Sequence, residues 1–125
     1  MKSRFKRFSY RPVQPEDLAT VCGWVDDADT LFYLHPRAQF PLTVAQLAAT
    51  LAERELGTLL LADGAPVGLA NCYRQQPGEY ACIGNVIVAP QARGRGAARA
   101  LMAAMAEQAQ ARWQVKELRV SCFNG

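Results

Sequence analysis

The segment that most restricts the fold of this chain reads IGNVIVAPQARGRGAARALM, residues 83–102. It begins as an apolar strand, passes a proline and two glycines, and continues as an alanine-rich helix. Gly94 and Gly96 lie before the helix, where unpaired N–H groups and a partial positive charge favour an anion. Glycine lets that anion approach the main chain, and Arg93 and Arg95 add positive charge. The segment therefore predicts a phosphate or pyrophosphate site.

A glycine-rich loop before a helix has three other interpretations. A Walker loop needs Gly-Lys-Ser or Gly-Lys-Thr, which the chain lacks. A Rossmann fingerprint ends on glycine or alanine within a βαβ unit, whereas residues 94–99 end on arginine and follow predicted hairpins. A helix start that uses glycine and arginine only for solubility stays open as the plain alternative.

Length and composition favour one globular domain. The chain has 125 residues, of which 50% are hydrophobic and 20% charged. It contains no apolar stretch near the roughly 20 residues of a membrane span, and residues 1–11 carry charges without the apolar core of a signal peptide. We therefore expect a single domain over residues 1–125, located in the cytoplasm, with no membrane partner.

The net charge of +3 arises in a basic tip at residues 1–7, together with Arg11. Nucleic-acid binders usually spread basic residues over a face or a helix. Because the basic excess is confined to the start of the chain, we expect no nucleic-acid partner.

The cysteines do not form a metal or redox motif. Cys22, Cys72, Cys82 and Cys122 are widely spaced, and His35 is the only histidine. We expect no metal, and we expect reduced thiols buried among apolar neighbours. A Cys–His nucleophile pair would need one thiol to meet His35 in space, and nothing in the spacing favours it.

Hydrophobic periodicity and turn signals predict the order of the other elements. Pro15 opens a first helix, and Thr43 with Gln46 is a capping-box signature of a second helix, which Gly57 can end. Asp63-Gly64 favours a type I′ hairpin. The expected elements are a strand over 8–13, a helix with Leu18, Val21, Cys22 and Val25 on its buried face, a helix from 44, strands over 58–62, 65–73 and 80–88, a helix over 97–113 and a strand over 116–123.

The loop sequence resembles the signature of the GNAT superfamily of acyl-coenzyme A-dependent N-acyltransferases. That signature reads Gln or Arg, two residues, Gly, one residue, then Gly or Ala, and residues 91–96, QARGRG, fit it at each fixed position. The family order of strand, two helices, three-strand meander, loop, helix and fifth strand also matches. The resemblance implies an α/β (α+β) fold with a mostly antiparallel sheet flanked by helices.

The resemblance also implies an activity. It is the direct transfer of acetyl from acetyl-CoA, the co-substrate, to a primary amine of a small molecule or peptide. The alternatives are a coenzyme A-binding or regulatory module with weak catalysis, and an incomplete fragment of such an enzyme.

The resemblance implies site residues position by position. Backbone amides of the loop would cradle the coenzyme A pyrophosphate, and the strand before it would run beside the pantetheine arm. Aromatic residues and one asparagine would contact the acceptor amine. The implied cofactor contacts are Val86, Ile87, Val88, Gln91, Ala92, Arg93, Gly94, Arg95, Gly96, Ala97 and Asn124, and the implied acceptor contacts are Phe32, Tyr33, Tyr73 and Asn85.

The chain departs from the family pattern after the fifth strand. Asn124 matches the family's asparagine, but the following helix, whose tyrosine often acts as general acid, and the last strands are absent from the sequence. Tyr73 and Tyr80 do not match that tyrosine, and residues 83–88 contain no carboxylate, so the catalytic acid and base are unassigned. We expect weak catalysis, and self-association through the exposed strand 116–123 or completion by a separate segment.

Overall fold

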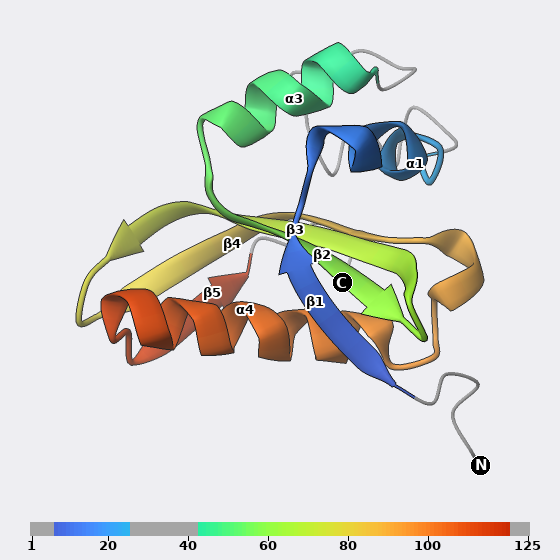
Figure 1. Cartoon of the computed structure of the whole chain (residues 1–125). Helices are drawn as coiled ribbons and strands as arrows, with labels where there is room; N and C mark the ends of the chain where they lie inside the picture. The colour runs from blue at the N-terminus through green and yellow to red at the C-terminus, as the bar shows by residue number, and fades with distance from the viewer. Residues whose placement is uncertain (1–6, 26–42, 121–125) are drawn as a thin grey trace.

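A five-stranded sheet forms the centre of the structure, a computed structural model that describes residues 7–25 and 43–120. The strand order is β1-β2-β3-β4-β5 (Figure 1). Strands β1 to β4 pair antiparallel, whereas β5 is parallel to β4. The strands are β1 Phe8–Pro12, β2 Glu55–Ala62, β3 Ala65–Gln76, β4 Tyr80–Val88 and β5 Glu117–Val120. The predicted mostly antiparallel sheet is confirmed.

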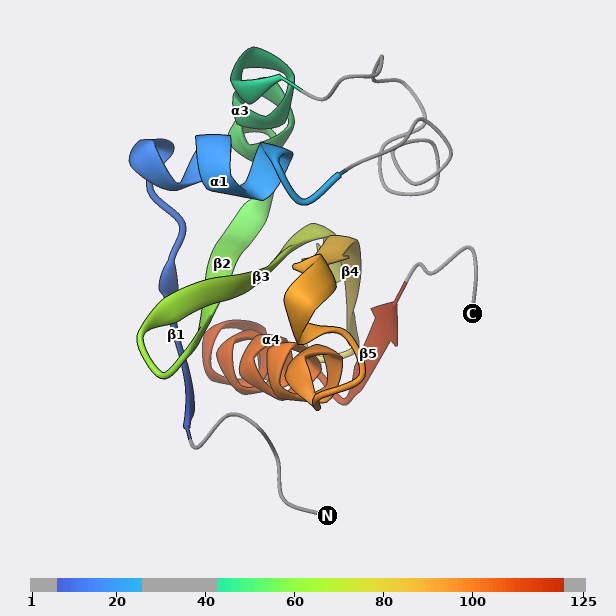
Figure 2. The same cartoon turned by 90° about the vertical axis from the view of Figure 1, so that its right-hand side faces the viewer.

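Helices cover both faces of this sheet. Helices α1 (Leu18–Cys22) and α3 (Val44–Ala52) lie together on one face, and α4 (Ala97–Trp113) lies along the other (Figures 1 and 2). Helix α4 contacts β2 and β3, and α1 contacts α3. The largest fully buried apolar side chains of the described residues are Leu47, Leu59, Leu60, Leu69, Ile83, Leu101 and Met105, together with Val21.

The hairpin between β2 and β3 forms as its turn residues predict. Asp63 has a φ of 51° and Gly64 a φ of 89°. A type I′ turn requires positive φ at both central residues, and aspartate and glycine tolerate that region better than other residues. The hairpin places β3 at the centre of the sheet, beside β4.

Helix α4 begins and ends at the predicted residues. Leu101, Met105 and Ala109 are fully buried on one face, as the spacing indicates. Gln114 caps the helix after Trp113: its φ of 52° is left-handed, and its N–H donates to the Gln110 carbonyl at 3.0 Å. Its first turn follows Gly96, so the helix N-terminus lies at the glycine-rich loop.

Several predicted boundaries are wrong. Strand β2 begins at Glu55 and not at residue 58, and β3 ends at Gln76 and not at residue 73. The ends of the first two helices also differ. Helix α1 ends at Cys22, and Val25 is buried beyond its end. Gly57 does not end α3, which stops at Ala52, but lies within β2. Glycine is needed there because a Cβ would lie 2.9 Å from Cγ1 of Val13, whose N–H donates to the Gly57 carbonyl at 3.0 Å. A close strand approach, and not a helix end, explains this glycine.

The described part of the chain contains no helix that is long and apolar enough to cross a membrane. Within it, Cys22, Cys72 and Cys82 are free thiols, of which Cys72 and Cys82 are buried. Burial raises the pKa of Cys72 and of Cys22. The predictions for Cys122 and for the end of strand 116–123 lie outside the described residues.

An ion pair connects β1 to the turn that precedes α1. Arg11 NH1 and NH2 donate to the two carboxylate oxygens of Asp17 at 2.8 and 2.9 Å. The backbone N–H of Gln14 donates to the same carboxylate at 2.7 Å. These hydrogen bonds, with that from Arg11 as the largest cause, lower the pKa of Asp17.

Asp17→Asn should destabilise the fold at neutral pH and flatten its acid sensitivity. A carboxyl whose folded-state pKa is lowered adds stability above its unfolded pKa of about 3.9 and loses it as pH falls through the folded value. We expect the free energy of unfolding to fall by about 1–2 kcal/mol at pH 7, and by less below pH 4. Urea unfolding at a series of pH values measures this change. Glu117→Gln, in the exposed pair with Arg119, is the control and should change little. If the free energy of unfolding falls equally with pH below 4 in wild type and in Asp17→Asn, the stabilising role of the Asp17 carboxylate is contradicted.

Candidate functional site

The glycine-rich loop forms a concentration of backbone N–H groups at the start of α4. After a 3₁₀ turn at Pro90–Ala92, Gly94 has a φ of 77° and Gly96 a φ of 87°. Within the described residues, the loop amides that donate backbone hydrogen bonds are those of Ala92, Arg93 and Arg95. The amides of Gly94, Gly96 and the first turn of α4 remain for an anion.

The two loop arginines fold back onto the main chain. Arg93 Nε donates to the Val88 carbonyl at 3.3 Å, and Arg95 Nε donates to the Gln91 carbonyl at 3.1 Å. In the described part of the chain, their terminal guanidinium nitrogens make no hydrogen bond. Both positive charges are therefore held beside the loop amides, and their terminal N–H groups are available to a ligand.

Strand β4 carries a bulge just before the loop. Leu69 pairs with Ile87, but Asn71 pairs with Gly84, so β4 has one more residue than β3 between these pairs. Asn85 has a φ of 52°, a left-handed conformation that asparagine adopts more readily than most residues. The bulge bends the strand where its pairing with β3 shifts.

Beyond the bulge, one edge of β4 is open within the described residues. The pairs with β5 run from Tyr80 to Ile83, where the described part of β5 ends. The N–H of Ala89 donates to the Val67 carbonyl at 2.8 Å, so the polar groups of Val88 point away from β3. The Val88 carbonyl accepts from Arg93 on that side, and an extended ligand there would share or displace this bond.

A buried polar cluster lies behind the bulge. Asn71, fully buried, donates through Nδ2 to Asn85 Oδ1 at 3.2 Å. Its Oδ1 accepts from Arg54 NH1 at 3.1 Å. Arg54 Cζ lies 5.3 Å from the centroid of the Tyr73 ring. This polar cluster, Arg54, Asn71, Tyr73 and Asn85, contains no carboxylate and no histidine.

The structure brings some predicted site residues together and leaves others undescribed. Asn85 and Tyr73 both belong to the polar cluster, and Val86 to Ala97 form the open edge and the loop that follows it. Phe32, Tyr33 and Asn124 lie outside the described residues. Arg54 and Asn71 join this cluster without having been predicted, although an asparagine inside the apolar run of β3 is a signal of a buried polar contact.

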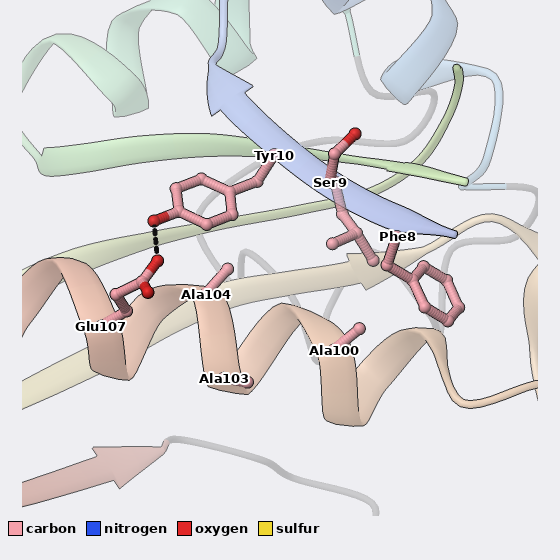
Figure 3. A pocket seen from close by; sticks show the side chains of 8 residues that line it. Phe8, Ser9, Tyr10, Ala100, Ala103, Ala104 and Glu107 are labelled. Atoms are coloured by element: carbon pink, nitrogen blue, oxygen red, sulfur yellow. Dashed lines mark hydrogen bonds between the residues drawn. The ribbon is translucent and has the colours of Figure 1, made fainter. Parts of the chain in front are cut away.

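A separate groove lies between β1 and α4, as Figure 3 shows. Its volume is about 270 Å³, and Phe8, Tyr10, Ala104 and Glu107 are among its lining residues. The Tyr10 hydroxyl donates to Glu107, and this bond is the largest cause of the raised pKa of Tyr10. Because the one carboxylate of the groove is engaged by Tyr10, the groove offers less chemistry than the loop and the bulge.

Comparison with known proteins assigns the family. The model of the acetyltransferase (GNAT) family matches residues 18–124. The chain belongs to this family. Acetyl-CoA-dependent acetyl transfer is the general reaction of the GNAT fold. A search of curated protein sequences finds no match.

Solved structures agree with the fold. An acetyltransferase of Trypanosoma brucei is 20% identical with a TM-score of 0.62, over 94% of this chain and 84% of its own. A GNAT family acetyltransferase of Staphylococcus aureus is 17% identical with a TM-score of 0.61, over 94% and 87%. N-acetylglutamate synthase of Neisseria gonorrhoeae, complexed with coenzyme A and L-arginine, is 20% identical with a TM-score of 0.63, over 90% and 24%.

Asn71→Ala should destabilise the protein because it leaves Asn85 and Arg54 without their shared partner. Loss of a buried hydrogen-bonded amide typically costs about 1–3 kcal/mol. Urea unfolding measures the change, and Gln76→Ala, at an exposed position of the same strand, should change stability by less than about 0.5 kcal/mol. Equal stability of the two variants would show that the polar cluster does not support the bulge.

Proposed function

We propose that this chain is an acetyl-CoA-dependent N-acetyltransferase, which transfers acetyl directly to a primary amine of a small molecule or peptide. One observation carries the proposal. A bulged strand, whose edge is open among the described residues, leads directly into a loop of available amides at a helix N-terminus. Residues 7–25 and 43–120 would belong to one acetyltransferase domain.

The residues of the loop and strand fit coenzyme A. A Cβ built at Gly94 meets nothing within 4 Å among the described residues, so a pyrophosphate has room to reach the amides. Within the loop from Ala92 to Ala97, the amides of Gly94, Gly96 and Ala97 would hold it, with Gln91, Arg93 and Arg95 around them. Val86, Ile87 and Val88 would lie beside the pantetheine arm, and Asn124 is proposed as a further contact. Coenzyme A supplies the acetyl group as a thioester.

The bulge would stabilise the transition state of the reaction electrostatically. As the amine nitrogen bonds to the acetyl carbon, negative charge grows on the carbonyl oxygen, and a backbone N–H at the bulge would stabilise it. The C–S bond then breaks, the departing thiolate takes up a proton, and the new amide gives one up. The groups that move these protons are unassigned.

A second candidate function is a coenzyme A-binding or regulatory module with little turnover. The same loop of available amides supports it, because binding of an anion there does not require turnover. The two candidates differ in one measurement, since only the enzyme releases free coenzyme A in proportion to added amine. The cytoplasm is the proposed compartment, because the free thiols Cys22, Cys72 and Cys82 suit a reducing one.

Coenzyme A should raise the melting temperature of the wild-type protein. Gly94→Ala should raise the Kd for coenzyme A at least about 10-fold and so reduce this stabilisation. A ligand at 100 times its Kd adds about 2.7 kcal/mol to stability. Gly78→Ala is the matched control, since Gly78 has a φ of 79°, also has nothing within 4 Å of a built Cβ, and lies at the other end of β4. Both variants should lose similar stability without ligand, at about 1–2 kcal/mol.

Coenzyme A should also bind more tightly than NAD, which has no pantetheine arm to lie along Val86–Val88. Equal titration curves for the two nucleotides would contradict the proposed site. So would equal losses of coenzyme A affinity in Gly94→Ala and Gly78→Ala.

We propose self-association through β5, the last strand of the described sheet. Val120 is 44% exposed on it, and an exposed apolar edge invites pairing with another chain. Light scattering should show a mass that rises with protein concentration, and Val120→Lys should reduce it. Val44→Lys, at a valine 43% exposed on a helix, should not. A constant monomer mass in wild type would refute the proposal.

A further inference from the structure

Arg54 has no part in the proposed binding of coenzyme A. It lies between the end of α3 at Ala52 and the start of β2 at Glu55. Its side chain is only partly exposed, and burial lowers its pKa. A guanidinium nevertheless stays protonated at neutral pH, so the fold keeps a partly desolvated positive charge at this point.

The guanidinium is held by neutral groups. NH1 donates to Asn71 Oδ1 at 3.1 Å, and the Tyr73 ring lies 5.3 Å from Cζ. A Cβ at Gly84 would lie 3.1 Å from NH1 and 2.8 Å from Cδ1 of Tyr73, so glycine leaves the space that both side chains occupy. The side chain is therefore fixed in one place by β3 and β4.

No carboxylate of the described residues neutralises this charge. The ion pairs among them involve Arg11, Arg112 and Arg119. Glu53 acts on Arg54 only through space and is itself exposed. Since a guanidinium has five N–H donors and the described residues accept one hydrogen bond, most of its donors remain for another group.

The fold places Arg54 beside the proposed acyl end of coenzyme A. A Cβ at Gly68 would meet Leu101 of α4, so Asn71, three residues along β3, faces the opposite side of the sheet. Arg54 therefore reaches the bulge from the side of α1 and α3. The loop that would hold the coenzyme A phosphates follows Val88, the last residue of β4, whereas Arg54 lies beside Gly84. Those phosphates therefore do not neutralise Arg54.

We propose that Arg54 recognises an anionic group of the acceptor. The acceptor is then a primary amine that also carries a carboxylate or a phosphate. This inference rests on the proposed acetyltransferase function. A guanidinium matches the paired oxygens of either group in a bidentate contact. Asn71 and the Tyr73 ring would orient it, so that the anion anchors the acceptor and its amine lies at the bulge.

The test measures acceptor binding to the protein saturated with coenzyme A, by calorimetric titration. The probes are two matched pairs: β-alanine with β-alaninamide, and O-phosphoethanolamine with ethanolamine. The anionic member of at least one pair should bind about 10- to 100-fold more tightly than its neutral partner. The pair that discriminates shows whether the anion is a carboxylate or a phosphate.

Arg54→Gln should abolish this preference, and Arg54→Lys should keep part of it. Arg112→Gln is the matched control, because Arg112 also lies over an aromatic ring, that of Trp113 at 5.5 Å, but on the exposed end of α4. It should keep the full preference. If Arg54 only supports Asn71, Arg54→Gln will lower the melting temperature and weaken both members of each pair equally.

Equal binding within both pairs, no binding of any probe, or an unchanged preference in Arg54→Gln would overturn the inference. The proposed function is tested separately by the coenzyme A titration that precedes each measurement. If wild type and Arg54→Gln both bind coenzyme A and only the acceptor result fails, the inference about Arg54 is wrong and the proposed function stands. If wild type does not bind coenzyme A, the proposed function itself is wrong.

Discussion

The hydrogen bond from Asn71 to Asn85 connects the two strands at the bulge on which the candidate site depends. Asn85 occupies a left-handed conformation, which most residues avoid, and a buried partner offsets part of that cost. The bulge changes the register by one residue, so that Ile87 faces Leu69 and Val88 turns its polar groups away from β3. Without this register, the strand would approach the loop with a different set of backbone groups on its open edge.

The two ends of the site bind by different means. At the loop, the contributions come from main-chain amides and a helix N-terminus, which need glycine at positions of positive φ and little else from the side chains. At the bulge, they come from side chains of β3, β4 and the connection between α3 and β2, and a substitution in any one of them affects the others. This difference predicts that the loop tolerates exchange of its arginines better than the polar cluster tolerates loss of Asn71.

The sequence predicts most of the fold because its signals are local. The Asp63-Gly64 turn, the alanine-rich face of α4 and the QARGRG loop each contain within a few residues the information that fixes their structure. Gly57 is not a helix end because glycine is needed there for a contact with Val13, which is distant in the sequence. The position of Arg54 is hidden in the sequence for the same reason. The pairing of β2 with β3 brings it to Asn71, and the pairing of β3 with β4 brings Gly84 to the same place. Long-range contacts of this kind leave no periodic pattern.

Hydrogen exchange of the backbone amides, with and without coenzyme A, tests the central claim most directly. The proposed ligand site is the edge of β4 that is open among the described residues, together with the loop before α4. Coenzyme A should therefore slow exchange over residues 86–99 and leave the turn at residues 77–79 unchanged. Protection that is absent from the loop, or that appears equally at both ends of β4, would contradict the account.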